Sequence, residues 1–147
     1  MNLKGKIVWL TGASSGIGEA LVKALAKEGA KLVLSARREQ ELQAVANNAQ
    51  LATGSYMILP LDLADQSNFE AKKNEVMAKF GRIDVVINNG GISQRSLAKD
   101  TSLDVDRKLM EVNYFGTVGL SKVVLPHMLA QKDGMLVSIS SAVGKFG

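Results

Sequence analysis

Residues 6–18 read KIVWLTGASSGIG, a short apolar run that leads into a glycine-rich turn. The run is rich in residues that favour strands. Directly after the turn, apolar residues recur at helical spacing at Ile17, Leu21 and Leu25, and Gly29 marks the end of that pattern. The stretch therefore predicts a strand, a tight turn and a helix, in that order.

The same alternation of strand-like and helix-like segments continues along the chain. The predicted strands are residues 6–10, 31–35, 56–59, 83–88 and 135–139. The predicted helices are a segment beginning at Ile17, residues 39–50, a segment beginning near Ser67, and residues 103–132, which form one long helix or a broken one with Pro126 as its candidate bend. Ser67 and Glu70 have the spacing of a capping box.

Five short strands separated by helices require crossover connections, which build a parallel sheet. The strands read as nearly continuous apolar runs, as expected when both faces of a sheet are covered. Right-handed crossovers then favour an α/β fold with a doubly wound, Rossmann-like parallel sheet. The strand order expected for such a sheet is 3-2-1-4-5. Because ligands bind such sheets at the carboxyl ends of the strands, the chemistry is expected in the turns after strands one, four and five. Residues 1–147 are expected to form one dinucleotide-binding domain.

The composition narrows the classes of function. Hydrophobic residues make up 46% and charged residues 22%, a balance typical of globular domains. The chain has no cysteine and one histidine, His127, so we expect neither a disulfide nor a metal site. The net charge of +4 comes without a basic stripe interleaved with aromatics, so no nucleic-acid partner is expected. No apolar run reaches the roughly 18–20 residues that span a bilayer, and we expect a cytoplasmic protein without a membrane partner.

The turn from Thr11 to Gly18 carries the clearest functional signal. Glycines allow the backbone to turn sharply and to approach a pyrophosphate, while the N-terminus of the next helix offers free N–H groups to phosphates. A tight strand-to-helix turn without a ligand is the alternative, but three glycines in seven residues exceed what such a turn needs. The predicted cofactor-binding residues of the turn are Gly12, Ser14, Ser15, Gly16, Ile17 and Gly18.

This turn and three later motifs resemble those of the short-chain dehydrogenase/reductase family. TGASSGIG looks like the family's glycine motif, and the sequence NNGG at residues 88–91 is similar to its N-N-A-G motif, with Gly90 in place of alanine. EVNYFGT at residues 111–117 resembles the segment that carries an active-site asparagine, and SISSAVG at residues 138–144 resembles the serine segment. The four motifs occur in the family's order across the whole chain. The run NNGGISQRSL…LPHM further resembles the branch related to 11β-hydroxysteroid dehydrogenase.

The resemblance implies an oxidoreductase that moves hydride between a nicotinamide cofactor and the carbonyl or secondary alcohol of a small molecule. In the family a tyrosine donates or accepts the proton, and a nearby lysine lowers the pKa of that tyrosine. A serine forms a hydrogen bond with the substrate oxygen, and an asparagine helps to order a path for the proton. Fixed donors beside a developing alkoxide lower the barrier. By motif match the catalytic residues are Asn113 and Ser141, which precedes Gly144 at the family spacing. Ser140 is the alternative serine. Ser141 could instead be a turn residue that satisfies local backbone groups. Asn113 could instead be a polar residue in mid-helix whose amide is satisfied locally.

The end of the second strand predicts which nicotinamide nucleotide binds. A carboxylate there would bind the ribose diol of NAD and would repel a 2′-phosphate. The resemblance places Ala36 at that position, and Arg37 and Arg38 follow it. Because a guanidinium can pair with a phosphate through two hydrogen bonds, we expect NADP(H) rather than NAD(H). A solvated arginine pair at a helix start is the alternative.

Further cofactor contacts are implied by motif match alone. Asp62 and Leu63 lie in a segment that resembles the family's adenine-contacting segment, where a carboxylate could accept a hydrogen bond from the adenine amino group. An aspartate that prepares a helix is the competing interpretation of Asp62. The other predicted contacts are Asn88, Asn89, Gly90 and Gly91. One of the two asparagines is expected to tie neighbouring strands together with Thr11, while the glycines keep the backbone open to the cofactor ribose.

The sequence departs from the family pattern in one large respect. It contains no Tyr-x-x-x-Lys, since Tyr56 is followed at that spacing by Pro60, and Tyr114 by Val118. Family spacing places the tyrosine shortly beyond Gly147, so the chain is expected to be the N-terminal part of a longer protein and to be inactive by itself.

Two consequences follow from the missing segment. Without a sixth strand, residues 135–139 are expected to form an exposed apolar edge that promotes self-association. A homo-oligomer is expected for the full-length form. A non-catalytic NADP(H)-binding module and an interaction fragment remain alternative functions, because binding alone requires neither Ser141 nor Asn113.

Overall fold

The computed structural model describes residues 2–141 of the chain. Its strands are β1 (Ile7–Thr11), β2 (Lys31–Ser35), β3 (Tyr56–Ile58), β4 (Val85–Asn88) and β5 (Met135–Ser138). Its α-helices are α1 (Gly16–Lys27), α2 (Glu39–Asn48), α3 (Phe69–Phe80), α4 (Leu103–Met110) and α5 (Thr117–Gln131). The 3₁₀ helices η1 (Gln66–Asn68) and η2 (Ala98–Asp100) precede α3 and α4, and the π-helix η3 (Glu111–Gly116) joins α4 to α5.

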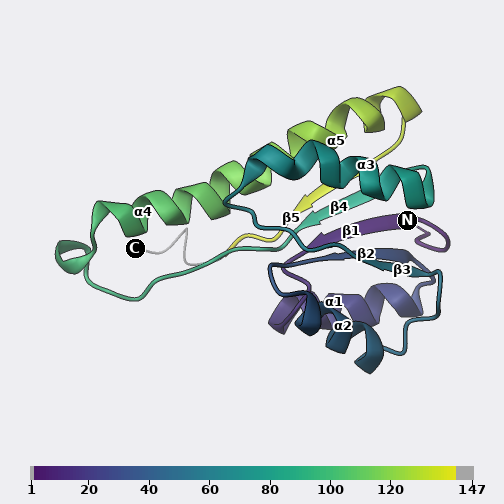
Figure 1. Cartoon of the computed structure of the whole chain (residues 1–147), viewed down its shortest axis with the longest axis horizontal. Coiled ribbons are helices and arrows are strands. Elements are labelled where there is room, and N and C mark those ends of the chain that lie inside the picture. The colour runs from purple at the N-terminus through teal and green to yellow at the C-terminus, as the bar shows by residue number, and fades with distance from the viewer. Residues whose placement is uncertain (1, 142–147) are drawn as a thin grey trace.

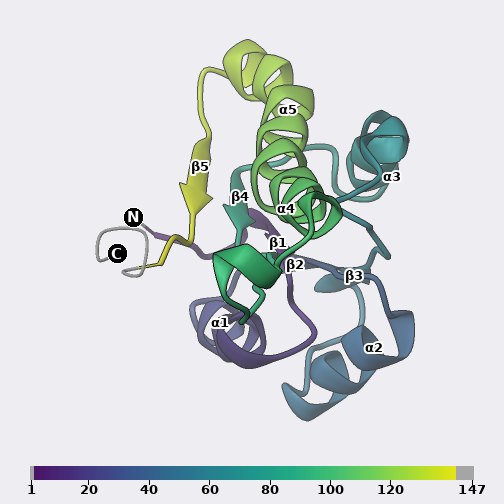
Figure 2. The same ribbon diagram turned by 90° about the vertical axis from the view of Figure 1, so that its left-hand side faces the viewer.

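The strands form one parallel sheet of order β3-β2-β1-β4-β5, as the sequence predicts (Figure 1). β1 pairs with β2 along its whole length, from Ile7 opposite Lys31 to Thr11 opposite Ser35. Helices α1 and α2 cover one face of the sheet, and α3 and α5 cover the other (Figure 1 and Figure 2). The doubly wound α/β fold is therefore confirmed.

Two apolar layers hold the helices to the sheet. Successive strand residues face opposite sides, so Val8 and Leu10 pack in the layer with α1 and α2, whereas Ile7 and Trp9 pack in the layer with α3 and α5. The indole N–H of the fully buried Trp9 donates a hydrogen bond of 2.9 Å to Ser35 Oγ. Because a buried indole N–H needs an acceptor, this serine allows a large side chain to fill the core beside β2.

The predicted capping box at the start of the third helix is wrong. Asp65 is the N-cap residue of the preceding η1, and its Oδ1 accepts a hydrogen bond of 3.1 Å from the Ser67 backbone N–H. The α-helix begins only at Phe69, after the turn of η1. Glu70 forms an ion pair with Lys73 instead of reaching back to the cap. An ionised carboxylate only accepts hydrogen bonds, whereas a serine hydroxyl also donates them. The carboxylate of Asp65 therefore fills the capping position that was predicted for Ser67.

The long helical region departs from regular α geometry at Glu111–Gly116, not at Pro126. That segment is the π-helix η3, whereas Pro126 lies inside α5. A π segment inserts an extra residue into the helical hydrogen-bond pattern and is frequent at functional sites. The broken helix that the sequence allowed is thus present, but its irregular segment contains Asn113.

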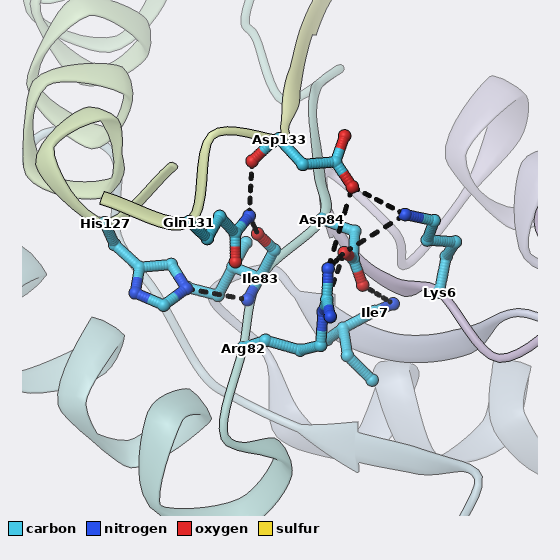
Figure 3. A network of polar contacts seen from close by, with 8 residues as sticks. All are labelled: Lys6, Ile7, Arg82, Ile83, Asp84, His127, Gln131 and Asp133. Atoms are coloured by element: carbon cyan, nitrogen blue, oxygen red, sulfur yellow. Dashed lines mark hydrogen bonds and ion pairs between the residues drawn. The ribbon is translucent and has the colours of Figure 1, made fainter. Parts of the chain in front are cut away.

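The amino-terminal ends of β1, β4 and β5 are joined by a polar cluster, shown in Figure 3. The buried Asp84 carboxylate accepts hydrogen bonds of 2.8 Å from the Ile7 backbone N–H and from Arg82 Nε. Lys6 Nζ lies 3.5 Å from Asp84 and donates to Asp133 Oδ2 at 2.8 Å. Because the strands are parallel, this cluster lies at the end of the sheet opposite the glycine turn, and its role is to hold three strands in register.

The predicted apolar edge is confirmed at β5 (Figure 2). Met135, Leu136 and Ile139 are 42%, 39% and 41% exposed, whereas every residue of the neighbouring β4 is buried. Leu125 and Leu129 of α5 are exposed as well. An edge with these side chains offers both free backbone groups and apolar surface to another chain.

Candidate functional site

The turn between β1 and α1 needs glycine at three positions for two different reasons. Gly12 and Gly16 have φ angles of +64° and +56°, a region that side chains disfavour. A Cβ on Gly18 would lie 2.0 Å from the Gly12 carbonyl oxygen, so no side chain fits there. Ser15 is the N-cap residue of α1 and makes no side-chain capping hydrogen bond within the described chain. The first N–H groups of α1 are therefore left to another acceptor.

β4 is tied to this turn through Thr11 and Asn89. The Asn89 backbone N–H donates to Thr11 Oγ1 at 3.1 Å, and its side-chain amide donates to the carbonyl oxygens of Thr11 and Gly12 at 3.1 and 3.2 Å. The Gly90 N–H also donates to Thr11 Oγ1, at 2.9 Å. The expected tie between strands is thus confirmed, and Asn89 is the asparagine that makes it. Asn88 is buried and donates instead to Ser121 Oγ at 3.2 Å.

These turns line a cavity of about 490 Å³ at the carboxyl ends of the strands, a volume within the range of small-molecule sites. The predicted site residues that line it are Gly12, Ser14, Ser15, Gly16, Ile17, Arg37, Arg38, Asp62, Leu63, Asn89, Gly90 and Gly91. Gly18 and Asn88 are not among the described lining residues. Gly18 shapes the cavity indirectly, because the absence of a side chain there lets the Gly12 backbone pack closely against it.

The charged groups of the cavity lie mainly after β2. Arg37 makes no ion pair with any residue between 2 and 141, whereas Arg38 Nη2 lies 2.7 Å from Glu41 Oε2. Asp62 also lines the cavity, after β3, and its Oδ1 accepts a hydrogen bond of 2.9 Å from the Ala64 backbone N–H. That turn-forming bond supports the local structural role for Asp62, but it occupies one oxygen of the carboxylate and leaves the adenine contact a prediction.

Leu63 explains the glycine that departs from the family motif. A Cβ on Gly90 would lie 2.7 Å from Leu63 Cδ1, and a Cβ on Gly116 would lie 2.7 Å from the Leu63 carbonyl oxygen. Leu63 therefore lies against two glycines, one after β4 and one at the end of η3. With alanine at position 90, the end of the Leu63 side chain would have to rotate away. Because Leu63 lines the cavity, this substitution would also change the cavity wall.

Asn113 lies in the middle of η3 and bonds to the turn after β4. Its Nδ2 donates to the Ile92 carbonyl oxygen, and its Oδ1 accepts from the Ile92 N–H, both at 2.8 Å. The side-chain amide is therefore satisfied, as the competing interpretation holds. It is held beside the cavity all the same, because Ile92 is a lining residue and a Cβ on Gly91 would lie 3.1 Å from Asn113 Oδ1.

The two candidate serines lie after the end of β5. Ser140 and Ser141 are exposed, and neither they nor any residue of β5 lines the cavity. Gly144, which favoured Ser141 over Ser140, lies outside the described residues. The choice between the two serines therefore stays a prediction. Of the three turns in which the chemistry is expected, those after β1 and β4 line the cavity, and further lining residues follow β2 and β3 or lie on α4 and η3.

Sequence reasoning missed several lining residues, of which Lys108 and Val112 are the most informative. They lie four positions apart on α4 and η3, and Val112 is buried. Residues four apart share one face of a helix. Val112 directly precedes Asn113, and Lys108 lies one helical turn before Val112. This spacing is the sequence signal that could have identified both residues.

No group of three or more metal-binding side chains occurs in the part of the chain that the structure describes. His127 has a structural partner instead, since its Nε2 accepts a hydrogen bond of 3.3 Å from the Ile83 backbone N–H (Figure 3). Among the described helices, none combines the length and the apolar character that crossing a bilayer requires.

Solved structures share this fold and its sheet. One is a metagenomic short-chain oxidoreductase in complex with NADP, with a TM-score of 0.91 and 32% identity, matched over 100% of this chain and 67% of that one. Another is a short-chain dehydrogenase/reductase from Burkholderia phymatum in complex with NAD, with a TM-score of 0.91 and 26% identity over 98% of this chain and 52% of that one.

Sequence comparison gives the same result. The human dehydrogenase/reductase SDR family member 7 is 53% identical over 146 residues, which are 97% of this chain and 43% of that protein. The chain thus spans less than half the length of this relative. The family model described as short chain dehydrogenase matches residues 6–147. With the glycine turn, the Thr11–Asn89 tie and the π-helical asparagine in place, the chain belongs to the short-chain dehydrogenase/reductase family.

Proposed function

We propose that the chain is the cofactor-binding part of an oxidoreductase that transfers hydride between NADP(H) and the carbonyl or secondary alcohol of a small molecule. The observation that carries the proposal is the single cavity in which the glycine turn, the Asn89–Gly91 turn and Arg37 converge. A dinucleotide is long enough to reach from the helix N-terminus to the end of the second strand, and doubly wound sheets bind it there.

The residues present fit a dinucleotide. A pyrophosphate needs a tight turn that presents its backbone, and side chains on Gly12 or Gly18 would open this turn, because their Cβ atoms would lie 2.8 Å from Gly90 Cα and 2.0 Å from the Gly12 oxygen. The N-terminus of α1 adds unpaired N–H groups and a partial positive charge. Ser14 and Ser15, both lining the cavity, supply hydroxyl donors.

Arg37 is the residue that we propose to select NADP(H) over NAD(H). It lines the cavity and has no ion-pair partner in residues 2–141. Its guanidinium can therefore bind a 2′-phosphate without breaking an existing ion pair. Ala36, the preceding lining residue, contributes no charge to repel that phosphate. The NADP and NAD complexes among the related structures support a nicotinamide cofactor in general. The preference for NADP(H) rests on Arg37.

The chemistry follows from the cofactor and from two residues of this chain. When bound, a nicotinamide ring supplies or accepts the hydride. We propose that Asn113, held by Ile92, helps to order the proton path, and that Ser141 donates a hydrogen bond to the substrate oxygen, where negative charge develops. Because Tyr-x-x-x-Lys is absent from these 147 residues, the chain alone is expected to bind NADP(H) without turnover.

Calorimetric titration of the purified chain, and of the full-length protein that carries it, with NADP⁺ and NAD⁺ tests the proposal. We expect NADP⁺ to bind at least about tenfold more tightly, a difference of one charge-assisted contact. Equal affinities for the two nucleotides would overturn the preference for NADP(H). If neither nucleotide binds, the alternative function as an interaction fragment is favoured. NADPH binding without turnover of any carbonyl or alcohol by the full-length protein would identify a non-catalytic binding module.

The cytoplasmic location and the homo-oligomeric state of the full-length protein are further proposals, based on the sequence expectations above. Cell fractionation and light scattering after size-exclusion chromatography test them separately. Neither result bears on the cofactor.

A further inference from the structure

Lys108 approaches the cavity from an element that carries none of the glycine or arginine motifs. It lies near the end of α4, and together with Val112 of η3 it forms part of the cavity wall. Figure 1 shows α4 extending beyond the sheet on the side where the strands end. The lysine therefore lines the cavity from the α4 side, whereas Arg37 and Arg38 follow β2.

The charge of Lys108 is not compensated by the described chain. Its neighbour Arg107 donates a hydrogen bond of 2.9 Å from Nη1 to Asp104 Oδ1, and Arg38 is paired with Glu41. Lys108 makes no ion pair with any residue from 2 to 141. The two adjacent cations of α4 thus differ: Arg107 is paired with Asp104 and is not among the described lining residues, whereas Lys108 lines the cavity.

The described cavity wall has more cations than acids. Arg37, Arg38 and Lys108 are its cationic residues, and Asp62 is its acidic residue. Clustered charge of one sign in a cleft raises the local concentration of ligands of the opposite sign. A lysine on a flexible stem can follow a phosphate over several ångströms, because it binds as a point charge and not as a fixed fork.

We propose that Lys108 is an anion-binding residue of this cavity and binds the phosphate groups of the dinucleotide from the α4 side. The proposal rests on the proposed function and adds a contact that none of the sequence motifs contains. Lys108 contributes binding energy and selectivity, and it takes no part in the transfer of hydride or proton.

The test compares Lys108→Gln with Arg107→Gln in the full-length protein, using NADP⁺ and NAD⁺ titrations at low and high salt. Glutamine keeps the helix propensity and most of the side-chain length of both residues. We expect Lys108→Gln to weaken NADP⁺ binding about fivefold at low salt, the size of one exposed ion pair, with a smaller loss at high salt. Arg107→Gln should leave the affinity unchanged, and Lys108→Arg should restore it.

The two nucleotides distinguish which phosphate is bound. A loss for NADP⁺ alone assigns Lys108 to the 2′-phosphate, and an equal loss for both assigns it to the pyrophosphate. Unchanged affinity of Lys108→Gln for both nucleotides overturns the inference while the proposed function stands. If the wild-type protein binds neither nucleotide, the proposed function fails and this inference fails with it. Equal thermal unfolding midpoints of the two glutamine variants establish that folding is not the cause.

Discussion

Asn113 and Ile92 are joined by two hydrogen bonds of 2.8 Å, one in each direction between a side-chain amide and a backbone peptide. The pair connects the middle of the π-helix η3 to the turn that follows β4. Because Ile92 lines the cavity, the asparagine controls the position of one cavity wall as well as its own.

Replacing Asn113 by leucine removes both hydrogen bonds. We expect the free energy of unfolding to fall by about 1 kcal/mol, since the site is exposed and water can replace the lost partners. NADP⁺ affinity should fall as well, because the turn after β4 loses its anchor. Urea titration and calorimetry measure the two effects. Asn74→Leu on α3 is the control, because Asn74 is exposed and its side chain makes no hydrogen bond within residues 2–141. An equal urea midpoint for both variants would count against the anchoring role.

Arg37→Glu and Arg38→Glu separate the two adjacent arginines. Arg37 lacks an ion-pair partner in the described chain, whereas Arg38 is held by Glu41. We expect Arg37→Glu to weaken NADP⁺ binding by more than about tenfold, through loss of a charge-assisted bond and added repulsion. Binding of NAD⁺ should change little. Fluorescence titration with the reduced nucleotides checks this, and a larger effect at Arg38 would reverse the assignment.

Gly18→Ala tests the steric requirement of the turn. The new Cβ would lie 2.0 Å from the Gly12 carbonyl oxygen, a backbone atom that cannot rotate away. We expect a loss of roughly 1–3 kcal/mol of stability, the range for overpacked sites, together with loss of nucleotide binding. Gly54→Ala is the control, since its Cβ would meet nothing within 4 Å and it has only a positive φ, of +83°. Chemical denaturation that ranks Gly54→Ala as the more harmful change would contradict the steric argument.

The Lys6–Asp133 ion pair should make stability depend on pH at the acid end. Its hydrogen bond holds the pKa of Asp133 below the usual carboxyl range and raises the pKa of Lys6. A lowered carboxyl pKa contributes stability that is present above the unfolded pKa of about 3.9 and is lost as the pH falls through the folded value. The raised pKa of Lys6 keeps the pair intact at least up to its ordinary pKa of about 10.4, beyond which the contribution is lost.

Asp133→Asn is the variant that tests this dependence. We expect its deficit in unfolding free energy, relative to the wild type, to be largest at neutral pH and to shrink toward pH ~3, below the ordinary pKa of the carboxyl group. Denaturant titrations at a series of pH values measure the deficit. Asp106→Asn on α4 serves as the control, because the exposed Asp106 carboxylate makes no ion pair with any residue between 2 and 141. A deficit for Asp133→Asn that stays constant down to the lowest pH would contradict the role of the ion pair.

Leu136→Lys should reduce self-association of the isolated chain. Leu136 lies in the edge strand β5 and is 39% exposed. A lysine on a free edge opposes pairing with a second strand through charge and hydration. Light scattering over a range of protein concentrations measures the change. Leu103→Lys on α4 is the control, because it replaces a leucine that is even more exposed, at 67%, and lies away from the edge strand. An equal decrease for this variant would indicate a general gain in solubility instead.

Local patterns were sufficient to predict the architecture. β2 has the predicted bounds, β1 is shifted by one residue, and the other three strands are shorter than predicted by one or two residues at one end. The agreement is close because apolar runs bounded by turn residues mark buried parallel strands clearly. The positions of Gly12 and Gly18 were also readable from the sequence, since the backbone geometry of this turn requires glycine there. The sequence did not show which of several neighbouring polar side chains would cap this region: Asp65 caps the 3₁₀ helix η1, and α3 begins after it without a side-chain cap.

The sequence by itself determined the alternation of strands and helices, the parallel sheet and the glycine turn, because these depend on residue spacing within about a dozen positions. Only the tertiary structure decided that Asn89 and not Asn88 ties β4 to Thr11, that Leu63 lies against Gly90, and that Lys108 reaches the cavity of Arg37. Each of these relationships joins residues that are distant in the sequence. Their distances are set by how the strands pair and how α4 continues into a π-helix, which no local pattern specifies.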